Sequence, residues 1–159
     1  MVKKFNETGL CFPDEHFMAD ISEKVAVTYK MVEDGAYFII NRPRQYGKTT
    51  LLHTIANKLI VSGDYVVFNI SFEGIGNAVF DDEKVFSRGF VRILSDFAFE
   101  SAPELETWLK SKMREVNSLK DLSAFITLLA NKANKKIVLL IDEVDKSSNN
   151  DLFINFIYQ

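Results

Sequence analysis

A short polar turn ending in Gly47, Lys48 and Thr49 joins two segments with different hydrophobic patterns. Residues 37–40 are continuously apolar, which predicts a strand, and residues 51–60 carry apolar side chains at helical spacing. The N-terminus of a helix has unpaired N–H groups and the positive end of the helix dipole, so it can hold an anion. The order strand, turn, helix therefore predicts an α/β unit whose loop is suited to binding an anion.

The turn matches the phosphate-binding pattern G-x-x-x-x-G-K-[ST] except at its first glycine, where Arg42 stands. Lys48 would place its ammonium near the β- and γ-phosphates, and Thr49 would offer its hydroxyl to Mg²⁺. Backbone N–H groups from Gln45 to Thr49 are the expected cradle. Arg44 could also contact phosphate, although loop arginines are more often solvated. The predicted cofactor-binding residues are Arg44, Gln45, Tyr46, Gly47, Lys48, Thr49 and Thr50.

Two further apolar runs, residues 65–70 and 137–141, predict more strands, and helical patterns separate all three runs. Strands alternating with helices imply parallel pairing with right-handed crossovers. The sequence thus predicts a three-layer α/β/α fold with a parallel sheet. We expect residues 1–36 to form a lead-in and a helix, and residues 37–159 to form the core.

Asp142 and Glu143 directly follow the apolar run 137–141. Ligands bind at the carboxyl edge of open parallel sheets, so acids placed there can meet a phosphate loop. Asp142 would hold Mg²⁺ opposite Thr49, and Glu143 would orient or deprotonate an attacking water. Alone, such a pair is more often an ordinary strand end, but it lies downstream of Lys48. The pattern predicts Glu143 and Lys48 as catalytic residues, Thr49 and Asp142 as metal ligands, and ATP and Mg²⁺ as cofactors.

Composition narrows the class of protein. With 159 residues, 47% of them hydrophobic, the chain can form one globular domain with a core. Its net charge of −3 does not indicate nucleic-acid binding through a general basic field. The single cysteine, Cys11, cannot form an intrachain disulfide, which fits a reducing compartment. No apolar run is long enough to span a membrane and the first residues lack a signal segment, so we expect a cytoplasmic protein without a membrane partner.

The chain as a whole resembles the bacterial AAA-ATPase-like family of predicted ATPases. In that family Arg-Pro-Arg-(Arg/Gln)-(Tyr/Phe)-Gly-Lys is the usual phosphate loop, so Arg42 fits the family pattern. The resemblance implies a P-loop NTPase of the additional-strand class that binds ATP and Mg²⁺. It implies Lys48 and Thr49 as Walker A residues, and Asp142 and Glu143 as Walker B residues. The segments that carry the resemblance are Phe5–Cys11, His16–Asp20, Asn41–Thr50 and Ile141–Lys146.

Members of that family usually continue well beyond this point, often to a nuclease-like domain. After the helix-like segment 151–158, this chain has no counterpart of the later sensor strand, arginine finger or lid. We therefore expect a P-loop core that is incomplete at its C-terminus, in a truncated product or a fragment. The alternative is a sheet that closes differently or takes a strand from a partner.

The expected function is ATP binding, with Mg-dependent ATP hydrolysis as the activity of the complete protein. One alternative is a nucleotide-binding regulatory module, and another is a truncated fragment without turnover of its own. The expected partners are ATP and either a second copy of the chain or a missing C-terminal domain. The sequence names no substrate beyond the nucleotide.

Overall fold

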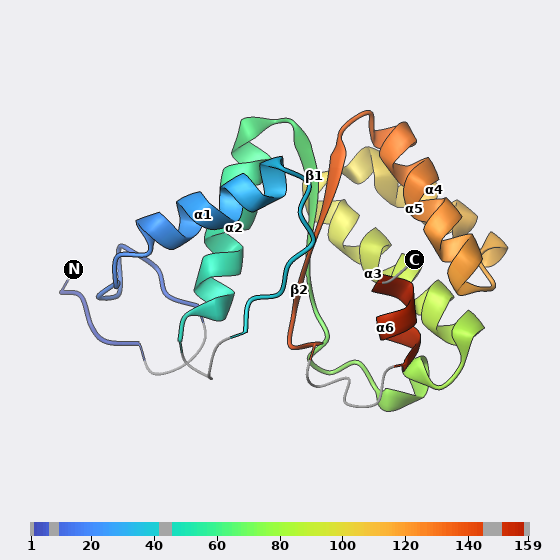
Figure 1. The fold of residues 1–159 in the computed structure, drawn as a ribbon, viewed down its shortest axis with the longest axis horizontal. Helices are drawn as coiled ribbons and strands as arrows, with labels where there is room; N and C mark the ends of the chain where they lie inside the picture. Colours follow the sequence, from blue (N-terminus) through green and yellow to red (C-terminus); the bar gives the residue numbers. More distant parts are fainter. Residues whose placement is uncertain (1, 7–9, 42–45, 145–150, 158–159) are drawn as a thin grey trace. The chain divides into compact units, whose positions relative to one another are not determined.

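The computed structural model describes residues 2–6, 10–41, 46–144 and 151–157 (Figure 1). Two of the predicted phosphate-binding residues, Arg44 and Gln45, lie outside these ranges. By its internal contacts the chain divides into two compact units, Met1–Ser62 and Gly63–Gln159. Each unit is described by itself below.

The first unit contains two helices, α1 (Ser22–Glu33) and α2 (Lys48–Ser62), which pack against each other. The Lys58 ammonium of α2 lies 4.2 Å from the ring centroid of Tyr29 in α1, a cation–π contact that adds to their packing. Gly35 follows the end of α1 and has a φ of 68°, in the left-handed region. The Gly35 N–H bonds to the Val32 carbonyl and the next N–H to the Met31 carbonyl, which is the Schellman arrangement at a helix C-terminus.

The predicted strand at residues 37–40 is wrong, because the structure assigns this segment to no strand. Its side chains alternate in exposure: Tyr37 and Ile39 are 65% and 81% exposed, whereas Phe38 and Ile40 are half-buried. An apolar run favours an extended backbone, but strand formation also needs a neighbouring strand, which hydrophobic pattern does not specify.

The second unit is built on a parallel pair of strands, β1 (Tyr65–Ser71) and β2 (Lys136–Asp142). Their register runs from Tyr65 opposite Lys136 to Ser71 opposite Asp142. The other elements of this unit are η1 (Asn77–Phe80), α3 (Glu83–Ser101), α4 (Pro103–Lys112), η2 (Met113–Glu115), α5 (Leu119–Ala133) and α6 (Asp151–Ile157). Helices α3 to α6 lie on the same side of the strand pair (Figure 1). The chain has the α/β class and the parallel pairing that its alternating segments predict.

Polar side chains define where the long helices of this unit begin. The Asp82 carboxylate accepts the Val85 N–H at 2.8 Å at the start of α3. The Ser118 hydroxyl accepts the Asp121 N–H at 3.1 Å at the start of α5. In return the Asp121 carboxylate accepts the Asn117 N–H at 2.9 Å. These caps satisfy N–H groups that the helices themselves leave without an acceptor.

The core of the second unit lies between β1 and the helices. The apolar side of α3 faces this core, because Phe86, Phe90 and Leu94 are at most 2% exposed. The ring of Phe156 in α6 lies 5.0 Å from that of Phe90, centroid to centroid, so α6 packs on the same cluster. The Trp108 and Phe125 rings stack at 5.3 Å and join α4 to α5.

One arginine ties α3 to the connection between α4 and α5. The Arg88 guanidinium donates to the Val116 carbonyl at 3.1 Å, to the Arg114 carbonyl at 2.9 Å and to the Asn117 side-chain oxygen at 2.8 Å. Because a planar guanidinium carries five donors in a fixed arrangement, one side chain can hold several loop acceptors in place.

Candidate functional site

Gly47 stands at the junction between the predicted phosphate loop and α2. Its φ is 76°, in the left-handed region that glycine enters without strain. A Cβ added there would meet nothing within 4 Å, so backbone conformation rather than crowding favours glycine. The Gly47 carbonyl accepts the Leu51 N–H at 2.9 Å, which places the first turn of the helix directly after it. The predicted turn into a helix at Gly47 is confirmed.

The first turn of α2 consists of Lys48, Thr49 and Thr50. Lys48 is half-buried, Thr49 is exposed and Thr50 is buried. This turn carries no acidic side chain that would offset the positive end of the helix dipole. Helix geometry gives its first N–H groups no acceptor within the helix. The local structure therefore fits an anion such as a phosphate group.

Asp142 and Glu143 lie together at the carboxyl end of β2, and both are half-buried. The Asp142 carbonyl accepts the Phe72 N–H at 3.1 Å, which joins this end of β2 to the residue after β1. Its carboxylate oxygen Oδ1 accepts the Glu143 N–H at 2.9 Å. The predicted acids are thus placed at the sheet edge where parallel sheets bind ligands.

Glu143 has a φ of 56°, which puts a residue with a side chain in the left-handed region. This conformation costs a non-glycine residue about 1 kcal/mol or more, and such strain is found most often at functional sites. The sequence around Glu143 does not predict this left-handed backbone conformation, because glutamate has no preference for the left-handed region.

The two halves of the predicted site belong to different units. Lys48 and Thr49 lie in Met1–Ser62, whereas Asp142 and Glu143 lie in Gly63–Gln159. Tyr46, just before Gly47, is 67% exposed. Within the first unit the structure places Lys48 next to Thr49, and within the second it places Asp142 next to Glu143.

The predicted metal ligands are of the type that Mg²⁺ prefers. A threonine hydroxyl and an aspartate carboxylate are hard oxygen donors, and Mg²⁺ usually binds to one or two such groups together with substrate phosphates and water. Among the described residues, no group of three or more His, Cys, Asp or Glu side chains could hold a metal ion by itself. The predicted residues Thr49 and Asp142 therefore fit Mg²⁺ by the chemistry of their donor atoms.

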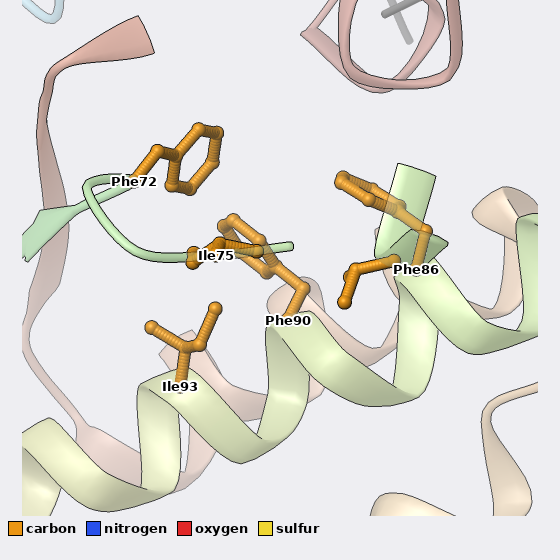
Figure 2. A pocket seen from close by; sticks show the side chains of 6 residues that line it. Phe72, Ile75, Phe86, Phe90 and Ile93 are labelled. Atoms are coloured by element: carbon orange, nitrogen blue, oxygen red, sulfur yellow. The ribbon is translucent and has the colours of Figure 1, made fainter. Parts of the chain in front are cut away.

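An apolar hollow lies in the second unit between the loop after β1 and α3 (Figure 2). It leaves no space for a water molecule, so it cannot take a nucleotide. It belongs to the packed apolar core of this unit. The lining residues are Phe72, Ile75, Val79, Phe86, Phe90 and Ile93.

Among the described helices, none combines the length and the apolarity that crossing a membrane requires.

Comparison with known families gives a match that covers most of the chain. The model of an ATPase domain family, described as predominantly from Archaea, matches residues 29–157. The chain belongs to this ATPase domain family. The match includes both Lys48 and Asp142, and therefore both halves of the predicted site. No curated protein and no solved structure matched the chain.

Membership of this ATPase family supports an ATP-binding NTPase domain of the P-loop class. It agrees in general with the ATPase resemblance expected from the sequence. The bacterial family and the additional-strand class are finer expectations, and they stay predictions.

Proposed function

We propose that this ATPase domain binds ATP together with Mg²⁺ at the N-terminus of α2 and hydrolyses it. The observation that carries the proposal is the local structure around Gly47 in a chain of this family. A left-handed glycine leads directly into a helix whose first turn has no acidic side chain. Such a turn presents backbone N–H groups and a positive dipole end to an anion.

In this proposal the first turn of α2 binds the phosphates. Lys48 neutralises charge on the β- and γ-phosphates, and Thr49 supplies a hydroxyl oxygen to Mg²⁺. Asp142 supplies a carboxylate to the same ion, and Glu143 orients or deprotonates the attacking water. The left-handed φ of Glu143 supports a functional role, because a strained residue persists only where the surrounding structure holds it.

Calorimetric titration with ATP and Mg²⁺ tests binding. Lys48→Ala should weaken ATP binding by at least about tenfold, since it removes the ammonium at the phosphates. Lys24→Ala is a matched control, because Lys24 is an exposed lysine on α1 of the same unit. It should bind ATP as the wild type does. Equal heats for wild type and Lys48→Ala would show that the phosphate loop does not bind ATP.

Phosphate release separates hydrolysis from binding alone. Glu143→Gln should keep ATP binding and lose turnover, because the amide cannot accept a proton from water. Unchanged turnover would remove Glu143 from the mechanism. A wild-type chain that binds ATP but releases no phosphate would favour the nucleotide-binding regulatory module instead. Asp142→Asn should weaken the dependence of ATP binding on Mg²⁺, measured by titrations with and without EDTA.

A further inference from the structure

Residues 10–17 precede α1 in the first unit, and backbone hydrogen bonds join the C-terminal end of this segment to Lys4. The Lys4 N–H donates to the Glu15 carbonyl at 3.0 Å, and the Phe17 N–H donates to the Lys4 carbonyl at 3.1 Å. His16 is 7% exposed, and its Nδ1 accepts the Phe12 N–H at 3.1 Å. The segment therefore has a defined shape that backbone and side-chain hydrogen bonds maintain.

This segment is joined to the first turn of α2 by a hydrogen bond from Cys11. The Cys11 N–H donates to the Thr50 hydroxyl oxygen at 3.4 Å, and Thr50 is only 8% exposed. The Asn6 amide supports the donor, because its Nδ2 donates to the Leu10 carbonyl at 3.0 Å and lies 3.5 Å from the Cys11 sulfur. A buried hydroxyl in the proposed phosphate-binding turn is thus bonded to a segment about 40 residues earlier in the sequence.

We propose that Thr50 is a positioning residue that couples nucleotide binding at this turn to the N-terminal segment 10–17. The inference rests on the proposed function. The Thr50 hydroxyl oxygen accepts the Cys11 N–H, so this bond links the position of the first turn of α2 to that of the segment. A phosphate held by the first N–H groups of α2 would fix that turn, and with it the acceptor of the Cys11 N–H.

Coupling of this kind works in both directions. If nucleotide stabilises the Cys11–Thr50 bond, then the bond must stabilise nucleotide binding by the same factor. The N···O distance of 3.4 Å is longer than the usual range of about 2.7–3.2 Å, so the bond is weak and the expected factor is at most about two- to fivefold. A contact that only packs the segment onto α2 would predict no such factor.

Amide hydrogen exchange at single-residue resolution, measured by NMR, tests the coupling. In the wild type a non-hydrolysable ATP analogue with Mg²⁺ should slow exchange of the Cys11 amide as well as the amides of the first turn of α2. In Thr50→Val, which keeps the shape but lacks the hydroxyl, the Cys11 amide should exchange faster without nucleotide. Its nucleotide-dependent protection should be lost, and the affinity should fall by about two- to fivefold. Thr50→Ser keeps the hydroxyl and should restore both properties.

The outcomes separate this inference from the proposed function. If the analogue neither binds nor protects the first turn of α2, the proposed function fails and the inference fails with it. If the first turn is protected but the Cys11 amide is unchanged, ATP binding stands and the coupling is refuted. The coupling is also refuted if Thr50→Val weakens binding while nucleotide still protects the Cys11 amide, because Thr50 would then act directly on the nucleotide.

Discussion

The left-handed backbone at Glu143 predicts an unusual stability difference between two variants. Glu143→Gly and Glu143→Ala both remove the carboxylate and everything that it contacts, while both keep the N–H that donates to Asp142. They differ in one respect, since only alanine keeps the Cβ that makes a φ of 56° unfavourable. The comparison therefore isolates the backbone strain from the loss of the acid.

The expected difference follows from two opposing terms. Relief of the left-handed conformation favours the glycine variant by about 1–2 kcal/mol. The greater freedom of glycine in the unfolded chain disfavours it by about 0.5–1 kcal/mol. At the middle of both ranges, Glu143→Gly should therefore be more stable than Glu143→Ala by roughly 0.75 kcal/mol. For a chain of this size that is about 1–4 °C in melting temperature.

Urea unfolding followed by the fluorescence of Trp108, the single tryptophan, reports on the unit that contains Glu143. Ala124→Gly is the control, because Ala124 is exposed within α5 and has ordinary helical geometry. There glycine should be less stable than alanine by about 1 kcal/mol. If glycine is also the less stable residue at position 143, Glu143 is not strained as we argue.

Two further predictions concern other polar contacts. Arg88→Ala should lower the free energy of unfolding by about 1–3 kcal/mol, because it leaves three hydrogen-bond acceptors without their shared donor. The control is Arg92→Ala, at an exposed site on the same helix, which should change the free energy of unfolding by less than about 0.5 kcal/mol. Equal effects of the two variants in the Trp108 assay would show that the Arg88 hydrogen bonds do not stabilise this unit. Hydrogen bonds from the Ser22 hydroxyl and N–H lower the pKa of the Asp20 carboxyl below its usual value. Their stabilising effect is therefore present above the unfolded pKa and is lost as the pH falls through the folded pKa. Ser22→Ala should raise the pKa of Asp20 in an NMR titration, and an unchanged pKa would exclude the Ser22 hydroxyl as its cause.

Hydrophobic pattern predicted much of the second unit correctly. The runs 65–70 and 137–141 are the two paired strands almost to the residue. Both runs are almost continuously apolar, and helical patterns lie between them, so parallel pairing was the natural expectation.

Features that depend on distant contacts were not predictable in the same way. Residues 37–40 have the composition of a strand, but composition does not state which strand would pair with them. The bond between Cys11 and Thr50 joins segments that share no motif, so no local pattern in the sequence predicts it. The φ of Glu143 is set by how the chain leaves β2, whereas glutamate itself favours ordinary backbone regions.

The parallel pairing of β1 with β2 also has a consequence during synthesis. Tyr65 pairs with Lys136, so β1 leaves the ribosome about 70 residues before its partner strand. At translation rates of roughly 5–20 residues per second, its apolar run Tyr65–Phe68 would wait for roughly 4–14 s without its neighbour. During that time, of the helices in its own unit, α3, α4 and α5 are made and can cover it. The nascent chain is therefore most prone to aggregation in this interval, and variants that weaken α3 should reduce soluble yield more than their equilibrium stability suggests.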